Sequence, residues 1–155
     1  VVGYGLSGDA YHITAPSPDG DGAFRCMSMA MKRAGVAPGD IDYINAHGTG
    51  TPLNDGIEAA AIQRVFGDTA HRLAVSSTKA ALGHTLGAAG AIEGLTTVLA
   101  LRDGFLPPTV NLEEPDPACD LDLVPRRSRA ARLRYALSNS YGFGGNNTVV
   151  VFGRA

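Results

Sequence analysis

The chain has 155 residues, of which 45% are hydrophobic and 18% charged, and its formal net charge is −2. A chain of this length forms one domain and buries roughly 68–70% of its unfolded surface, which is enough for a core of its own. The charge excludes the basic footprint of a nucleic-acid-binding protein. The longest apolar stretch contains His84 and Glu93 among many glycines, so it is a poor membrane span. We therefore expect a cytoplasmic protein with no nucleic-acid or membrane partner.

Hydrophobic periodicity, glycines and prolines predict strands that alternate with helices. A strand near 1–6 precedes a loop rich in proline, glycine and aspartate, and a helix then runs from about Asp21 to about Ala34. The later predicted elements are a strand at 41–46, a helix at 54–66, a strand at 73–77, a helix at 84–103, an irregular proline-rich stretch to about Arg134, and strands near 135–139 and 147–153. The last two strands form a hairpin-like pair. This alternation predicts an α/β domain in which a mixed β-sheet packs against helices in layers.

His47 stands between a predicted strand and a predicted helix. Ile41 to Asn45 alternates like a short strand, and Pro52 to Asp55 carries helix-start chemistry. Between them, His47-Gly48-Thr49-Gly50-Thr51 offers an imidazole, two hydroxyls and open backbone. Such a loop can project the imidazole into a cleft while the hydroxyls and the open backbone bind a ligand.

A second segment, Ser76 to His84, leads into an apolar helix. Only Glu93 is formally charged between Ala80 and Leu101, and glycines and alanines are frequent there, which predicts a buried helix. His84 is predicted near the N-terminus of this helix, where the dipole favours a neutral ring. An isolated buried carboxylate is strongly unfavourable, so Glu93 needs Lys79, a bound cation or a proton.

Together these segments resemble the C-terminal half of a β-ketoacyl-[acyl carrier protein] synthase, a condensing enzyme of fatty-acid synthesis in the thiolase superfamily. The motifs stand in family order: Asn45 to Pro52, Ser76 to Lys79, Gly83-His84, Gly87 to Ala91 with Glu93, Pro107-Pro108-Thr109, Cys119 to Asp122, and Asn139-Ser140 leading to Gly142-Phe143-Gly144-Gly145. The segment from Ser7 to His12 is more similar to elongating, dissociated type II enzymes than to modular polyketide synthases. The resemblance implies a thiolase-like half-domain over residues 1–155, without the N-terminal half that carries the nucleophile.

By this resemblance, His47 and His84 are a catalytic pair. In the family, the two histidines assist decarboxylation of a malonyl thioester and stabilise the enolate oxygen that forms, a task suited to two neutral N–H donors. Lys79 corresponds to the residue that orients His84 and tunes its electrostatics.

The resemblance also implies how the acyl and pantetheine groups are held. The backbone N–H of Phe143 corresponds to half of the oxyanion hole of the acyl-enzyme, and its ring can gate the acyl pocket. Gly142 and Gly144 let the chain approach the thioester closely. Thr49 and Thr51 match positions that hydrogen-bond the phosphopantetheine arm of the acyl carrier protein.

No cofactor of the protein's own is expected, apart from a structural Na⁺ or K⁺. Family members often hold such a cation with side chains that correspond to Asn45, Glu93, Ser138 and Asn139. The argument from Glu93, which needs a buried partner, agrees with this implication.

Neither cysteine fits the family's nucleophile, which stands on a sharp turn at a helix N-terminus. Cys26 lies in a helical stripe with Ala23 and Met27, and Cys119 follows a proline-rich loop. No disulfide between them is expected. The first residues are already strand-like, so we expect a truncated or domain-length polypeptide. Its partners would be acyl carrier protein, the missing N-terminal half and, in the full-length enzyme, a second copy.

Two other sequence patterns suggest different sites but lack the context that those sites need. Gly3, Gly5 and Gly8 spell a dinucleotide-binding pattern, but no amphipathic helix follows. His47, His84 and Glu93 lack the spacing of a transition-metal site.

A run of arginines could contact an acidic carrier protein, although a solvated connector is favoured; these residues are Arg126, Arg127, Arg129, Arg132 and Arg134. His12 and His71 are assigned surface roles. Two functional classes remain: an enzyme half that needs the cysteine half, and a non-catalytic fragment or carrier-binding module. A polyketide ketosynthase half is a further alternative.

Overall fold

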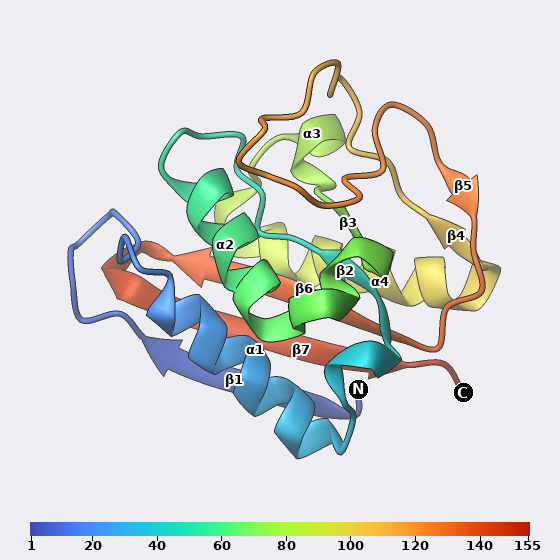
Figure 1. Cartoon of the computed structure of the whole chain (residues 1–155), viewed down its shortest axis with the longest axis horizontal. Coiled ribbons are helices and arrows are strands. Elements are labelled where there is room, and N and C mark those ends of the chain that lie inside the picture. Colours follow the sequence, from blue (N-terminus) through green and yellow to red (C-terminus); the bar gives the residue numbers. More distant parts are fainter.

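Residues 1–155 are described by a computed structural model, in which a five-stranded sheet lies between helices (Figure 1). The strands of this sheet are β1 (Gly3–Gly8), β2 (Ile41–Asn45), β3 (Ala74–Ser76), β6 (Tyr135–Gly142) and β7 (Asn146–Gly153). The α-helices are α1 (Asp21–Ala34), α2 (Asn54–Phe66), α3 (Lys79–Leu82) and α4 (Ala89–Asp103). Short 3₁₀ turns occur at η1 (Pro38–Asp40), η2 (Gly67–Arg72), η3 (Leu86–Ala88) and η4 (Phe143–Gly145).

The sheet is mixed, as the sequence predicts. Its order is β1-β7-β6-β2-β3. β6 and β7 form an antiparallel hairpin, β1 adds antiparallel to β7, and β2 runs parallel to both β6 and β3. The carboxyl ends of β2, β3 and β6 therefore lie at one edge of the sheet.

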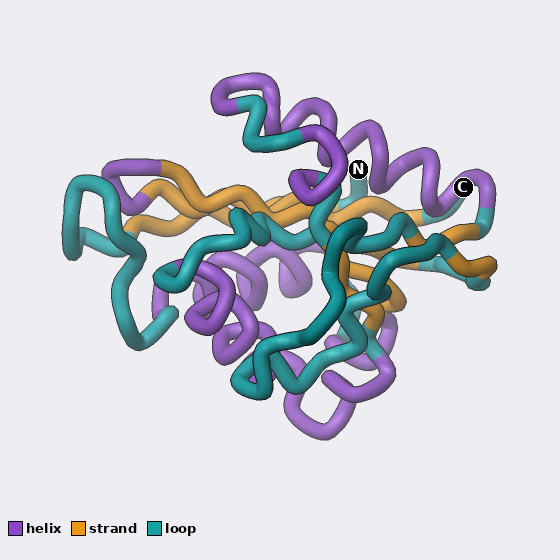
Figure 2. The backbone as a smooth tube through the Cα atoms, turned by 90° about the horizontal axis from the view of Figure 1, so that it is seen from above, coloured by secondary structure: helices purple, strands orange, loops and turns teal.

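Helices cover both faces of the sheet (Figure 2). On one face, α1 and α2 pack through Met27 and Ile62 onto Leu137 and Val149. α1 approaches β1 closely, because a Cβ atom at Gly5 would lie 2.1 Å from the carbonyl oxygen of Cys26. Glycine is required at this crossing, and α1 lies closer to its strand than a side chain would allow.

The opposite face of the sheet is covered by α4. Tyr43 and Ala136 of the sheet pack there with Ala100 and Leu101 of the helix. The outer side of α4 is open, with Leu95 60% and Val98 42% exposed. The predicted burial of this helix is thus correct for one side only, because an apolar composition does not say which face the chain itself covers.

The predicted start of α4 at residue 84 is also wrong. Gly83 has φ +75° and ends the short helix α3, and η3 follows before α4 begins at Ala89. Leu86, at φ +51°, and the 3₁₀ turn η3 occupy the first residues of the predicted helix, so the observed helix begins five residues later, at Ala89. His84 lies in the link between α3 and η3, five residues before α4 begins, rather than in the first turn of that helix.

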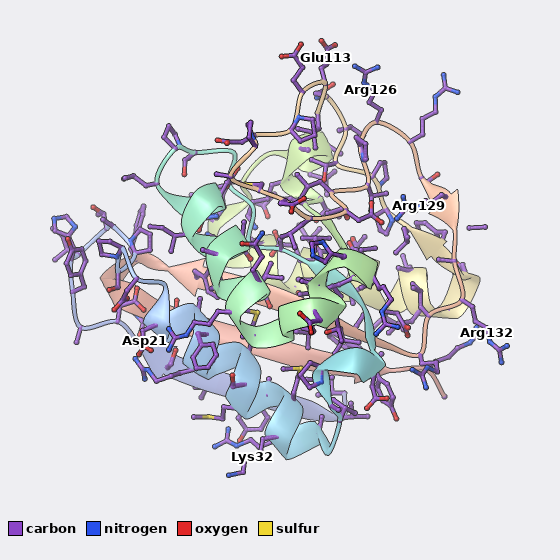
Figure 3. All side chains as sticks on the ribbon, in the orientation of Figure 1. Asp21, Lys32, Glu113, Arg126, Arg129 and Arg132 are labelled. Atoms are coloured by element: carbon purple, nitrogen blue, oxygen red, sulfur yellow. The ribbon has the colours of Figure 1, made fainter.

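The proline-rich stretch is not wholly irregular. Two-residue strands β4 (Phe105–Leu106) and β5 (Arg129–Ala130) pair antiparallel in a second small sheet. The arginines around β5 are exposed, and Arg126 and Arg132 point away from the body of the molecule (Figure 3). Arg129 forms an ion pair with Asp122.

None of the helices is both long enough and apolar enough to span a bilayer.

Candidate active site

Three loops with chemistry-bearing residues leave the same edge of the sheet. His47 follows β2, Lys79 and His84 follow β3, and Phe143 follows β6. These three strands are parallel, so their carboxyl ends meet, which is where α/β sheets gather their sites. The sequence argument for a shared edge is confirmed.

The rings of His47 and His84 lie side by side. Their centroids are 5.5 Å apart and the planes are nearly perpendicular, at 82°. The backbone N–H of Leu86 donates to Nδ1 of His84 over 3.1 Å. With Nδ1 as acceptor, a neutral His84 carries its proton on Nε2 and can donate from there. The predicted proximity of the two histidines is confirmed.

His47 is buried, with 8% of its surface exposed, whereas His84 is exposed. Burial, followed by the charges of Lys79 and His84, lowers the pKa of His47 to about 3. His47 is therefore a neutral imidazole at physiological pH. Its Nδ1 is buried and has no hydrogen-bond partner. The centroid of the Tyr141 ring lies 5.6 Å from the centroid of the His47 ring.

Glu58 is a residue of this region that the sequence analysis missed. It accepts hydrogen bonds from the backbone N–H groups of His47 at 3.0 Å and Gly48 at 2.8 Å. Burial raises the pKa of Glu58, while these hydrogen bonds oppose that rise. A signal was present, since Asn54, Glu58, Ile62 and Phe66 recur every four residues and all face inward.

Lys79 and Glu93 form a buried ion pair between α3 and α4. Their side chains are only 4% and 3% exposed. Of the three partners that the sequence allowed for Glu93, the structure shows Lys79. Burial raises the pKa of Glu93, and the hydrogen bond and charge of Lys79 counteract this rise.

Three of the four residues expected to hold a cation lie on the α4 face. Asn45 pairs in register with Ser138, and the Asn45 amide donates to the backbone oxygen of Glu93 over 3.2 Å. Asn45 Oδ1 and Glu93 Oε2 are buried without partners. The Asn139 side chain points to the other face, where its amide donates to Glu58 over 3.1 Å.

The Phe143 loop is braced by the segment after β1. Gly144 N–H donates to Ile13 over 2.8 Å, Asp9 N–H donates to Gly145 over 2.9 Å, and the Asn147 amide donates to the Asp9 carboxylate over 2.6 Å. Gly144 and Gly145 have φ +77° and +71°, values that favour glycine. The ring of Phe143 is 75% exposed, and Gly142 beside it is also exposed.

The hydroxyls of Thr49 and Thr51 share a hydrogen bond of 2.9 Å at the rim of the site. A cavity of about 350 Å³ is lined by Thr49 but not Thr51, and it extends between α2 and the 109–123 segment. Its lining includes Gly48, Thr49, Lys79, Thr109 and Cys119.

Both cysteines are free, and neither is activated. Burial raises the pKa of the Cys26 thiol to about 11. Burial and nearby carboxylates, Asp116 first, raise the pKa of Cys119. A nucleophilic cysteine needs the opposite shift, so the described chain contains two histidines without a thiolate beside them.

Known proteins are similar to this chain in sequence and in fold. The family model for the beta-ketoacyl synthase C-terminal domain matches residues 1–113. The 3-oxoacyl-[acyl-carrier-protein] synthase 2 of Rhizobium meliloti (strain 1021) is 58% identical over 154 residues, which are 99% of this chain and 36% of the relative. The solved ishigamide ketosynthase/chain length factor is 46% identical with a TM-score of 0.95, covering 100% of this chain and 38% of that one. The solved AntDE:AntF complex, a type II polyketide acyl-carrier protein with its ketosynthase, is 38% identical with a TM-score of 0.96, covering 99% and 38%. The chain thus spans little more than a third of the length of these relatives.

Proposed function

Because the chain belongs to the β-ketoacyl synthase family, we propose that it supplies the histidine half of the active site of a 3-oxoacyl-[acyl carrier protein] synthase. The reaction is the decarboxylative Claisen condensation of an acyl-enzyme thioester with malonyl-acyl carrier protein in fatty-acid elongation. The observation that carries the proposal is the pair of rings, His47 and His84, at 5.5 Å. Two ring N–H donors at this spacing can meet on one thioester oxygen.

In the first step, the carbon–carbon bond to the malonyl carboxylate breaks and CO₂ leaves. The electron pair of that bond forms an enolate, whose negative charge gathers on the thioester oxygen. Nε2–H of His84 and the solvent-side N–H of His47 donate to this oxygen as the charge develops. His47 takes part in this step as a neutral ring.

In the second step, the enolate carbon attacks the carbonyl carbon of the acyl-enzyme. The tetrahedral oxyanion accepts a hydrogen bond from the backbone N–H of Phe143, and collapse expels the cysteine thiolate. Gly142 and Gly144 leave the backbone beside Phe143 open to the thioester. Lys79, held by Glu93, adds a fixed positive charge near the histidines.

The cysteine nucleophile is proposed to come from a segment outside these 155 residues. Neither Cys26 nor Cys119 has the depressed pKa that the reaction needs. Leu95 and Val98 of α4 are exposed, and so are Tyr4 and Leu6 of β1, which face the same side of the sheet. Such an apolar face suits packing against the rest of a longer protein. The isolated chain should therefore perform no condensation.

The proposed partners follow from the reaction. Acyl carrier protein brings the phosphopantetheine arm, which the hydroxyls of Thr49 and Thr51 can bind at the rim. One solved relative is a ketosynthase with its acyl-carrier protein, and another is a ketosynthase in complex with its chain length factor. We propose a dimer for the full-length enzyme, and a cytoplasmic location.

A structural Na⁺ or K⁺ is proposed on the α4 face of the sheet. Asn45 Oδ1 and Glu93 Oε2 are buried oxygens without partners, and the Ser138 hydroxyl faces the same side. Hard monovalent cations prefer such oxygen ligands, and a cation there would satisfy both orphaned atoms. Asn139 has its side chain on the other face, so the ligand set proposed is Asn45, Glu93 and Ser138.

Fatty-acid elongation is favoured over polyketide synthesis because the Rhizobium meliloti relative is 58% identical, against 38% for the AntDE:AntF ketosynthase. A chimera tests the function. This chain replaces the matching 154-residue segment of the Rhizobium meliloti enzyme, and products from acyl- and malonyl-carrier protein are identified by mass spectrometry. The proposal predicts elongated 3-oxoacyl products from the chimera. A folded chimera that makes none would overturn it.

A further inference from the structure

Glu58 is a buried carboxylate that the proposed reaction does not use. It lies in the second turn of α2 and is 3% exposed. Its partners are four uncharged hydrogen-bond donors, and no lysine, arginine or histidine forms an ion pair with it. Burying a charge whose only partners are amide groups costs folding free energy. This cost indicates that Glu58 has a role besides packing.

The four donors divide evenly between the two carboxylate oxygens. Oε1 accepts from the backbone N–H of His47 at 3.0 Å and from the Asn139 amide at 3.1 Å. Oε2 accepts from the backbone N–H of Gly48 at 2.8 Å and from the Asn54 amide at 3.2 Å. All four partners donate, so the arrangement suits an ionised carboxylate, whose two oxygens only accept. A glutamine would turn its NH₂ group toward two of these donors.

These contacts join three segments that build the site. His47 and Gly48 form the loop after β2, Asn54 begins α2, and Asn139 belongs to β6, which leads to the Phe143 loop. The loop is also held from its other side, because Ser77 Oγ donates to the Gly48 carbonyl over 2.7 Å. Gly48 has φ +42°, and a Cβ there would lie 2.5 Å from the Cβ of Ser77. The backbone at residue 48 is thus clamped at both its N–H and its C=O.

The His47 ring has no comparable anchor of its own. Its Nδ1 atom is buried and forms no hydrogen bond. Its direction is therefore set by the backbone at residue 47 and by packing against His84 and Tyr141. Of the backbone contacts at residue 47, the one to a charged group is the bond to Glu58.

We propose that Glu58 is a positioning residue, which fixes the His47–Gly48 backbone and so aims the His47 ring at the point it shares with His84. Glu58 itself touches no reacting atom. The consequence for catalysis rests on the proposed function, but the structural consequence does not. Misplacement of a catalytic group by about 1 Å can cost roughly 100-fold in rate, so the precision of this backbone matters.

The structural test is amide hydrogen exchange, followed by NMR, in the 155-residue chain and its Glu58→Gln variant. We expect exchange at the His47 and Gly48 amides to speed up by about tenfold or more, as for loss of a hydrogen bond to a charged group, and the His47 ring resonances to shift. Ile62→Val, one turn further along the same buried face of α2, is the matched control and should leave both unchanged. The proposal would be overturned if Glu58→Gln kept the wild-type exchange rates and ring resonances. It would also be overturned if Ile62→Val changed them as much as Glu58→Gln does.

A second variant guards against failure to fold. Glu58→Asp keeps the charge but is one methylene shorter, so it cannot reach both backbone N–H groups. Glu58→Asp should show the same faster amide hydrogen exchange at Gly48. Exchange at the wild-type rate there would also contradict the proposal.

The kinetic test uses the chimera. Glu58→Gln should lower kcat by about tenfold or more while the KM for malonyl-carrier protein stays within about twofold, because the ring is misaimed and substrate binding is kept. A raised KM with unchanged kcat would contradict a positioning role. An inactive chimera with the wild-type chain counts against the proposed function, and the exchange experiment then decides the role of Glu58 alone.

Discussion

Lys79 and Glu93 hold each other in the interior, between a four-residue helix and the long helix that follows it. Their side chains are 4% and 3% exposed, the most buried of all the ion pairs in the chain. This pair fixes α3, and with it the start of the segment that carries His84, against the α4 face of the sheet.

Glu93→Ala should be severely destabilising. Removing one partner leaves the Lys79 ammonium buried and unpaired, which costs about 3–5 kcal/mol of unfolding free energy. Urea denaturation measures the loss. Glu113→Ala is the control, since Glu113 is exposed and its replacement should change stability by no more than about 0.5 kcal/mol. A Glu93→Ala protein that unfolds at the wild-type urea concentration would show that the pair has no structural role.

The proposed cation should appear in thermal melts. An ion that binds the folded chain but not the unfolded chain raises the melting temperature, and the rise grows with the ratio of its concentration to its dissociation constant. The wild type should therefore melt higher in sodium or potassium chloride than in choline chloride at the same ionic strength. Asn45→Ala removes one oxygen of the proposed ligand set and should abolish this difference. Equal melting in all three salts would remove the case for a cation.

The neutral state of His47 predicts a specific loss of stability in acid. The folded ring has a pKa of about 3, below the value of about 6.5 of an unfolded histidine. As pH falls below about 6.5, His47 binds a proton in the unfolded chain but stays unprotonated in the folded chain. The free energy of unfolding therefore decreases until about pH 3. Between pH 7 and pH 5 this costs at most about 2 kcal/mol.

His47→Gln isolates this contribution, because every other titrating group stays in place. Urea unfolding at pH 7 and pH 5 should show a smaller loss in the variant than in the wild type. The same loss in both proteins would mean that the His47 ring is charged in the folded chain.

The contact between Asp9 and Asn147 should restrain the Phe143 loop. Asn147→Ala removes a hydrogen bond to a carboxylate, worth about 1.5–3 kcal/mol, and should let the loop open more often. Because Phe143 is exposed, chymotrypsin should cut after it faster in the variant. Asn111→Ala, at an exposed asparagine of another loop, is the matched control. Unchanged cleavage at Phe143 would contradict the restraint.

The sequence was informative where local chemistry decides the structure. Strong periodicity and flanking glycines placed α1 and α2 at their observed bounds, and the alternating strands gave the mixed sheet. The position of the two histidines at one edge also followed, because it depends only on strand direction.

Other features depended on contacts between distant residues. The helix predicted from residue 84 begins only at Ala89, because residues 84–88 form a link and the 3₁₀ turn η3. The exposure of Leu95 could not be predicted, because the sequence of α4 is apolar both on the face that the sheet covers and on the face that is open. Glu58 escaped notice because its partners, His47 and Asn139, lie 11 and 81 positions away along the chain.

The central claim is that His47 and His84 act together on the malonyl thioester, while the nucleophile lies elsewhere. It is tested by CO₂ release from malonyl-carrier protein by the chimera after the proposed nucleophilic cysteine, expected in the Rhizobium meliloti segment, has been replaced. We expect decarboxylation to persist without the cysteine and to fall by about 100-fold or more in His47→Ala and in His84→Ala. Decarboxylation that continues at the same rate without either histidine would contradict it.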